Sequence, residues 1–342
     1  MTQSTAAGVL PDHEIQDLIN QSVMTAQSPF DADQVQPASL DLRLGDVAWR
    51  LRASFLPGAE HSVEDRLNQG LLMHSLDLRE GAVLEKGCVY LVPLQETLDL
   101  PPEISARANP KSSTGRVDVF TRLIVDQSKS FDDVPAGYQG RMYLEVAPQT
   151  FSVLVKTGCR LNQLRLRRGG PATETYTRDV TVDLSGGLCG YRARRHAGVV
   201  DMTREGAMTA REFWEPIGDL RRGLVLDPGE FYILVSKDDV TIPAHEAAEM
   251  LPIDPGVGEF RVHYAGFFDP GFGTEEAGGQ GSRGVLEVRS RETPFVLDDG
   301  QIVARLVYEP LSSRPQVLYG EQGSHYQSQG LRLSKYFTAW PE

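Results

Sequence analysis

The sequence contains few cysteines and no cysteine–histidine spacing typical of a metal site. Cys88, Cys159 and Cys189 are the only cysteines among 342 residues, and no two of them form a CxxC pair. An odd number of widely spaced cysteines supports neither a disulfide framework nor a structural zinc.

Long apolar runs and excess positive charge are also missing. No stretch reaches a membrane-spanning length, and residues 1–20 lack the basic and apolar regions of a signal peptide, so we expect a soluble cytoplasmic protein. The net charge of −13 repels polyanions in general, which argues against nucleic-acid binding. A triphosphate can still bind where arginine, lysine and backbone N–H groups converge, usually with Mg²⁺.

Helix signals are scarce, whereas strand signals are frequent. The 33 glycines and 21 prolines suit short strands joined by turns. Apolar runs rich in β-branched and aromatic residues, such as VYLVPL (89–94) and FYILVS (231–236), predict strands. Helices are predicted only at residues 11–20, with Asp12 as the candidate cap, and at 209–220, where the helix is broken near Pro216. The fold is therefore expected to be mainly β.

The chain repeats itself with a constant offset of 142 residues. Residues 39–42 align with 181–184, and Leu-Glu-Val at 144–146 aligns with 286–288. The offset holds over about 125 residues, which indicates the duplication of one domain. We expect two tandem antiparallel β domains, a first copy (1–168) and a second copy (175–342), with a linker around 165–180.

The first candidate site is the segment PKSSTGR at 110–116. Ser112 and Ser113 lie between the cations Lys111 and Arg116, next to a flexible Gly115. Hydroxyls and backbone N–H groups at a turn bind phosphate oxygens, and arginine can do so bidentately. The P-loop spacing is absent, and an ordinary polar turn would explain the segment taken alone.

The second candidate is the segment His263–Gly273, which holds Asp-Pro-Gly between aromatic residues. It predicts a hairpin whose apolar wall can stack on a base, with Asp269 accepting a hydrogen bond from a sugar hydroxyl. A turn packed on the core would explain the same residues.

The third candidate is the Glu pair. Glu145 and Glu287 each lie in an apolar strand, where a carboxylate is costly unless it is hydrogen-bonded or functional. Solvent-facing positions and shared ancestry are the alternative explanation. The polar tail, 319–330, usually indicates a frayed terminus, but its two tyrosines suggest that it docks on the protein.

Five motifs occur in the order found in one enzyme family: QPASLDLRLG (36–45), PKSSTGR (110–116), the Leu-Glu strand, Gly-x-x-x-x-Gln (158–163) and GSHYQSQG (323–330). The chain thus resembles the dCTP deaminases of the trimeric dUTPase-like superfamily, in a tandemly duplicated form. The resemblance implies a distorted β-barrel in each copy, with few short helices. It also implies hydrolytic deamination of dCTP to dUTP and ammonia in pyrimidine nucleotide metabolism.

The resemblance implies metal-free activation of water. A glutamate acts as general base on the water that attacks C4 of the cytosine. Mg²⁺ is expected only through the triphosphate, and no zinc is expected. The zinc-deaminase pattern H-x-E with P-C-x-x-C is absent from the sequence.

Family members build each site across a subunit boundary, and here each copy retains a different part of it. The second copy lacks the hydroxyls and arginine at 253–258, and the first copy has an extended loop at 132–138 instead of the hairpin. We therefore expect one composite site in which Glu287 is the base and Arg116 and Ser112 hold phosphate and position the water or leaving amine. Glu145 would be a relic or structural. The expected substrate-binding residues are Lys111, Ser113, Gly115, His263, Asp269, Gly271, Tyr319, His325, Tyr326 and Gln329.

Alternatives remain open at the level of function. A dUTP diphosphatase, or a bifunctional enzyme giving dUMP, would use Asp269 to activate water at the α-phosphate. A non-catalytic nucleotide-binding regulatory protein would bind without turnover. The expected partners are the small-molecule substrate and further copies of the chain, forming a homo-oligomer such as a trimer of two-domain chains.

Overall fold

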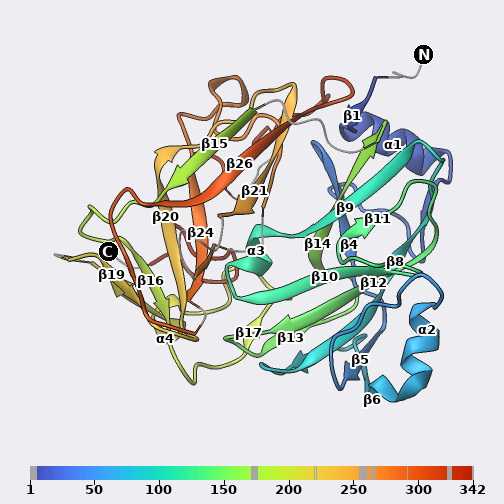
Figure 1. Cartoon of the computed structure of the whole chain (residues 1–342), viewed down its shortest axis with the longest axis horizontal. Helices are drawn as coiled ribbons and strands as arrows, with labels where there is room; N and C mark the ends of the chain where they lie inside the picture. The colour runs from blue at the N-terminus through green and yellow to red at the C-terminus, as the bar shows by residue number, and fades with distance from the viewer. Residues whose placement is uncertain are drawn as a thin grey trace.

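The computed structural model describes residues 6–170, 176–218, 220, 222–253, 266–290, 292–321 and 326–340, together with the backbone of 260–262. Figure 1 shows the first copy (blue to green) beside the second (yellow to red), with α3 between them. The α-helices in the described part of the chain are short: α1 (Asp12–Asn20), α2 (Val63–Arg66), α3 (Ser112–Gly115) and α4 (Ala210–Phe213). None of the described helices is long and apolar enough to span a bilayer. The expectation of a mainly β protein is confirmed.

The first copy is built from two antiparallel sheets. One sheet has the order β11-β9-β14-β4-β3, with β1 added to β14, and the other has the order β10-β12-β8-β5-β6, with β2 added to β8. Leu40 and Leu164 of the first sheet and Leu144 of the second are fully buried in a shared core. The strands are β1 (Gly8–Val9), β2 (Met24–Ala26), β3 (Val35–Gln36), β4 (Ser39–Arg43), β5 (Val47–Leu51), β6 (Leu72–Asp77), β8 (Val89–Asp99), β9 (Ile104–Pro110), β10 (Val119–Val125), β11 (Asp133–Val134), β12 (Gln139–Pro148) and β14 (Arg160–Arg168).

The second copy also has two main sheets, with orders β15-β26-β21-β23 and β18-β16-β20-β24-β22. Its own core includes Leu234, Leu286 and Leu306, all fully buried. The strands are β15 (Tyr176–Thr181), β16 (Gly190–Ala193), β18 (Trp214–Ile217), β20 (Phe231–Asp239), β21 (Glu246–Pro252), β22 (Phe260–Val262), β23 (Phe267–Phe268), β24 (Arg283–Ser290) and β26 (Ile302–Pro310).

The structure reproduces the 142-residue repeat at the ends of individual strands. The strands β9 and β14 begin and end 142 residues before β21 and β26. The same holds for β7 (Ala82–Leu84) and β13 (Val153–Val155) against β19 (Leu224–Leu226) and β25 (Phe295–Leu297). In the first copy, β7 and β13 form a small sheet. The strand β17 (Val200–Asp201), which belongs to the second copy, extends this sheet by pairing with β13.

Three local expectations need correction. The helix predicted at 209–220 ends at Phe213, because the buried Trp214 begins a strand that pairs with β16. Parts of the expected linker, 165–168 and 176–180, lie in strands, while 171–175 lie outside the described residues. The helix at 11–20 is confirmed, but Asp12 does not cap it and instead accepts the backbone N–H groups of residues 316 and 317.

The two copies meet partly through equivalent positions that carry opposite charges. Arg107 Nε lies 3.5 Å from Glu249 Oε1, and Arg167 forms an ion pair with Glu309. Both pairs join residues 142 apart in sequence. Identical residues at these positions would place like charges together, so divergence of the copies has made their contact self-complementary. Phe151 of the first copy also packs edge-on against Trp214 of the second.

The altered hairpin of the first copy gives a stability prediction. Half-buried Asp132 accepts the backbone N–H of Leu123 at 2.7 Å, and burial raises its pKa to about 7 from an ordinary 3.8. A carboxyl with a higher pKa in the folded state binds its proton more tightly when folded, so stability falls as the pH rises from about 4 to about 7. Asp132→Asn retains the acceptor without the charge. We expect it to stabilise the fold at pH 8 by about 2 kcal/mol, roughly half the full shift because the side chain keeps some solvent contact.

Denaturant unfolding of wild type and Asp132→Asn at pH 8 and pH 4 measures this effect. The gain should largely vanish at pH 4, where the carboxyl is protonated in the folded state and roughly half protonated in the unfolded state. An equal gain at both pH values would mean that ionisation of Asp132 is not its source.

Candidate active site

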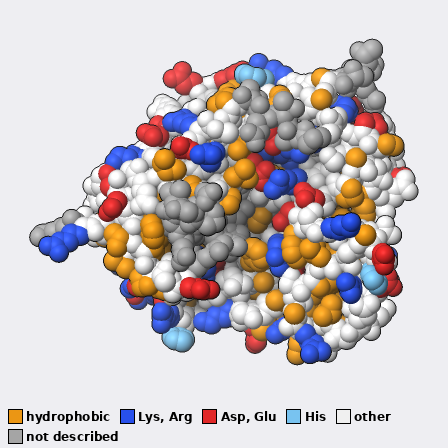
Figure 2. Space-filling view, viewed as in Figure 1, with side chains coloured by type: hydrophobic (Ala, Val, Ile, Leu, Met, Phe, Trp, Pro, Cys, Tyr) orange, Lys and Arg blue, Asp and Glu red, His pale blue; other side chains and the backbone are white. Residues whose placement is uncertain are grey.

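A cavity of about 740 Å³ is lined by residues of both copies. Figure 2 shows the surface hollowed between the copies, with basic and acidic side chains near its edge. The first copy contributes Lys111, Ser112, Ser113 and Arg116, and the second contributes Asp269 and Glu287. The C-terminal segment (319–340) also lines it, through Tyr319, Tyr326 and Gln329. The described residues of the expected composite site, apart from Gly115 and Gly271, therefore lie around one cavity.

Arg116 follows α3 and is almost completely buried, with 3% of its surface exposed. It donates to Gln329 Oε1 at 3.0 Å and to the backbone carbonyl of Arg332 at 3.1 Å. Its guanidinium carbon lies 3.9 Å from the ring centroid of Tyr326. Burial lowers the pKa of Arg116, while the negative charge of Glu287 opposes that shift. The C-terminal segment thus fixes the orientation of this cation.

Glu287 lies in the middle of β24 and is 3% exposed. Its carboxylate abuts Gly115 so closely that a Cβ atom on that glycine would lie 2.5 Å from both carboxylate oxygens. The absence of a side chain at 115 therefore allows the carboxylate of one copy to reach the phosphate motif of the other. The role of Gly115 is therefore to leave room for the Glu287 carboxylate, whereas the sequence predicted a direct contact between Gly115 and the substrate.

Ser112 and Ser113 begin α3, and Ser113 is buried. The backbone carbonyl of Ser113 accepts a hydrogen bond from Ser334 Oγ at 2.7 Å, which ties the motif to the C-terminal segment. Lys111 forms an ion pair with Asp41 at 2.5 Å, so its charge is shared with a neighbouring carboxylate.

Asp269 is buried at the edge of the cavity, beyond β23. Its Oδ1 lies 3.3 Å from Arg165 of the first copy, which also donates to the backbone carbonyls of Ala248 and Phe268. Burial raises the pKa of Asp269, and the charge of Arg165 opposes the rise. Gly271 has a φ of 92°, and a Cβ there would lie 2.8 Å from Leu318 Cβ. It shapes this turn and is not part of the cavity lining.

The C-terminal segment closes the cavity from one side. Tyr319 packs on Phe272 with ring centroids 5.4 Å apart. Gln329 donates to the backbone carbonyl of Arg283 at 3.1 Å while accepting from Arg116. The expected substrate residues His263 and His325 lie outside the described residues.

Comparison with known proteins identifies the family. Residues 6–170 match the family described as the 2'-deoxycytidine 5'-triphosphate deaminase (DCD) N-terminal domain, and residues 172–337 match the corresponding C-terminal domain. The chain belongs to the dCTP deaminase family. The expected family and enzyme class are thereby confirmed.

Individual members of the dCTP deaminase family support the assignment. A dCTP deaminase, dUMP-forming, from Beutenbergia cavernae is 32% identical over 170 residues, covering 49% of this chain and 84% of that protein. A dCTP deaminase from Halorubrum lacusprofundi is 29% identical over 161 residues, covering 46% and 75%. A crystal structure of 2'-deoxycytidine 5'-triphosphate deaminase from Agrobacterium tumefaciens superimposes with a TM-score of 0.86 at 49% identity, covering 91% of this chain and all (100%) of that one.

Glu145, the other glutamate of the repeated strand, lies apart from the cavity. It faces Arg122 on the adjacent strand β10, and its Oε1 accepts two hydrogen bonds from that arginine at 2.6 and 2.9 Å. Arg122 in turn stacks on Phe131, 3.7 Å from the ring centroid. In the described part of the chain the two members of the Leu-Glu pair therefore have different surroundings: Glu287 meets the phosphate motif of the other copy, and Glu145 meets Arg122 of its own copy.

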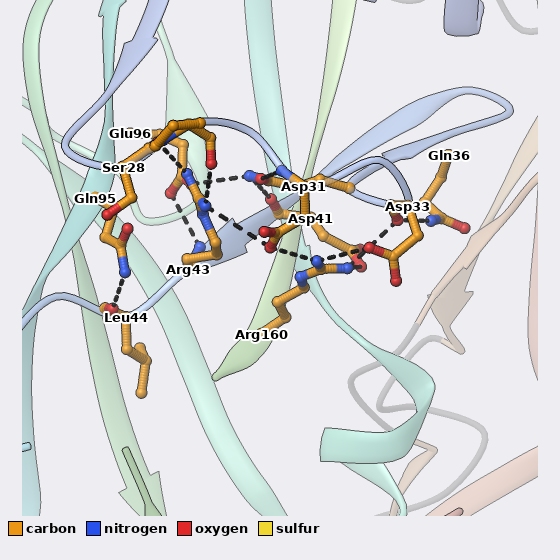
Figure 3. Close-up of polar contacts among 12 residues, drawn as sticks. Ser28, Asp31, Asp33, Gln36, Asp41, Arg43, Leu44, Gln95, Glu96 and Arg160 are labelled. Carbon is orange, nitrogen blue, oxygen red and sulfur yellow. Dashed lines mark hydrogen bonds and ion pairs between the residues drawn. The ribbon is translucent and has the colours of Figure 1, made fainter. Parts of the chain in front are cut away.

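A charged network behind the phosphate motif was not anticipated from the sequence. Arg160 binds Asp31 at 2.6 Å and Asp33 at 2.8 Å, and it lies 3.7 Å from Asp41, the partner of Lys111 (Figure 3). The carboxylate of Asp41, placed between Leu40 and Leu42 in a predicted strand, was the available signal. Its partners Lys111 and Arg160 are distant in sequence, and the motifs that contain them do not indicate this contact.

Further cations at the cavity were also missed. Lys156, Arg204 and Lys335 line it. Lys335 pairs with Glu205 at 2.7 Å, and Arg204 pairs with Asp201 at 2.9 Å. Among the described residues, no group of three or more His, Cys, Asp or Glu side chains is arranged to hold a metal ion.

Proposed function

We propose that the chain hydrolyses dCTP to dUTP and ammonia at the cavity between its copies. The observation that carries this proposal is the close approach of Glu287 to the motif that supplies Ser112 and Arg116. In a deaminase, a carboxylate next to such a motif can act as the general base that activates the attacking water.

Glu287 serves as the general base. Its carboxylate takes a proton from a water molecule as the water oxygen adds to C4 of the cytosine. That proton passes to ring N3, which holds the electron pair displaced from the C4–N3 double bond. Glu287 then takes the proton of the new C4 hydroxyl and gives it to the amine, the C4–N4 bond breaks, and a C4 carbonyl, a protonated N3 and ammonia result. Burial of the carboxylate favours this role, because bulk water does not weaken its interaction with the transition state.

Arg116 and the α3 hydroxyls hold the polar parts of the substrate. Arg116 is held by Gln329 and Tyr326, so its charge is preorganised for an oxyanion, either a phosphate oxygen or the oxygen developing at C4. Lys156 and Lys335 add positive charge along the cavity for the triphosphate. Mg²⁺ would arrive with the triphosphate as part of the substrate.

A bifunctional enzyme giving dUMP is the second candidate. Asp269 supports it, because a buried carboxylate at the cavity can activate water. The relative from Beutenbergia cavernae is named dUMP-forming, and so is one from Nanoarchaeum equitans that is 29% identical over 187 residues.

Product analysis tests the proposal. Purified protein with dCTP and Mg²⁺ should release one ammonia per dCTP consumed, and chromatography should separate dUTP from dUMP. Accumulation of dUTP supports the simple deaminase, whereas dUMP with pyrophosphate supports the bifunctional enzyme. Binding of dCTP without ammonia release would overturn both and leave a regulatory protein.

We also propose that a single chain contains a complete active site, whether or not chains assemble into a homo-oligomer. The protein is proposed to act in the cytoplasm. The two parts that family members take from different subunits, the phosphate motif and the glutamate, meet here within one chain, where Gly115 abuts Glu287. Activity per chain should therefore stay constant on dilution through any dissociation followed by light scattering. A loss of specific activity on dissociation would mean that another copy completes the site.

A further inference from the structure

An ion pair between a buried aspartate and a partly buried arginine connects the two copies beside the proposed site. Asp118, three residues beyond α3, is fully buried, and its Oδ2 accepts from Arg289 of β24. Thr150 Oγ1 donates to the same carboxylate oxygen at 2.6 Å and accepts from Arg289 at 2.8 Å. Arg289 also donates to the backbone carbonyl of Gly229 at 2.9 Å. The carboxylate, hydroxyl and guanidinium therefore form a compact cluster across the interface.

The two residues of this pair lie next to the proposed catalytic groups on the same two segments of the chain. Arg289 lies two residues after Glu287 on one strand, so both side chains point to the same face of the sheet. Asp118 lies two residues after Arg116, and its backbone N–H bonds to the carbonyl of Gly115. Glu287 against Gly115 and Arg289 against Asp118 are thus two neighbouring contacts between the same two segments.

The repeat shows that the pair belongs to this site only. Shifting by 142 residues places Phe260 at the position of Asp118 and Ala147 at that of Arg289. Neither residue can form an ion pair. The Asp118–Arg289 pair, which we call the clamp, therefore occurs where Arg116 and Glu287 are brought together. No matching pair can form beside Glu145.

The clamp also retains unmet polar groups. Asp118 Oδ1 and Arg289 Nε are buried without a hydrogen-bond partner in the described part of the chain. A buried pair with unsatisfied atoms is a poor source of stability, because apolar residues of similar volume often do as well. The presence of this pair beside the site is therefore better explained by a role in positioning the catalytic groups.

We propose that Asp118 and Arg289 are positioning residues, which set the separation of Arg116 and Glu287 by clamping α3 of the first copy against β24 of the second. The proposal rests on the proposed deamination of dCTP at this site. Loss of the clamp would shift the base relative to the bound cytosine, and displacements of about 1 Å can cost about a hundredfold in rate.

The test compares a neutral double variant with a matched control. Asp118→Asn with Arg289→Met removes both charges and keeps similar side-chain volumes. Arg167→Met with Glu309→Gln removes another ion pair between the copies, away from the cavity lining. The kcat and KM for dCTP and the unfolding midpoint are measured for both, and for the conservative Arg289→Lys.

The clamp variant should unfold within about 3 °C of wild type while its kcat falls about tenfold to a hundredfold and its KM changes less than threefold. Arg289→Lys should recover part of kcat, and the Arg167/Glu309 control should retain wild-type kcat. An unchanged kcat in the clamp variant, or an equal fall in the control, would overturn the positioning role. Wild type inactive on dCTP would instead overturn the proposed function, which keeps the two failures distinguishable.

Discussion

Glu287→Gln is expected to lower kcat for dCTP deamination by about 10²- to 10⁴-fold, the usual contribution of a general base. Glutamine has the size of glutamate but cannot accept a proton from water. Binding of dCTP should persist, because Ser112, Ser113 and Arg116 are unchanged. Ammonia release under single-turnover conditions measures the chemical step directly.

Glu145→Gln is the matched control within the same repeated motif. It leaves Arg122 without its anionic partner, so we expect a lower unfolding temperature. The kcat should stay within about threefold of wild type, because the site lies elsewhere and distant changes act independently. The reverse pattern, with loss of deaminase activity in Glu145→Gln and full activity in Glu287→Gln, would contradict the proposed composite site.

Gly115→Ala is expected to lower kcat about a hundredfold without unfolding the protein. The new methyl group would lie 2.5 Å from both oxygens of Glu287, so the carboxylate must move. Alanine is the better helix former, and α3 itself should not be weakened. The expected defect is therefore catalytic, with a normal unfolding midpoint.

Gly187→Ala is a suitable control for the glycine change, because nothing lies within 4 Å of a Cβ atom placed there. It should leave both kcat and stability near wild type. Full activity of Gly115→Ala would show that Glu287 does not need its present position against α3.

Much of the architecture follows from local patterns in the sequence. Alternating and β-branched runs predicted the strands, and the constant offset predicted the repeat that β9 and β21 reproduce. The loss of the hydroxyls and arginine at 253–258 in the second copy indicated a composite site. The strand and repeat inferences succeeded because each rests on neighbouring residues or on a fixed period, whereas the composite site stays a prediction.

Contacts between distant residues were not predictable in the same way. Asp118 and Arg289 are 171 positions apart, and Arg165 and Asp269 are 104 apart. A single sequence does not indicate which charges meet across an interface. The helix prediction at 209–220 failed for a related reason, since Trp214 is buried by tertiary packing that local propensity does not register.

The number of nucleotides bound per chain tests the central claim most directly. Equilibrium dialysis of Glu287→Gln with labelled dCTP and Mg²⁺ measures this number while turnover is slow. One composite site predicts saturation at one dCTP per chain, and replacing Arg116 should weaken that binding. Saturation at two per chain would show that each copy holds its own site and would contradict the account.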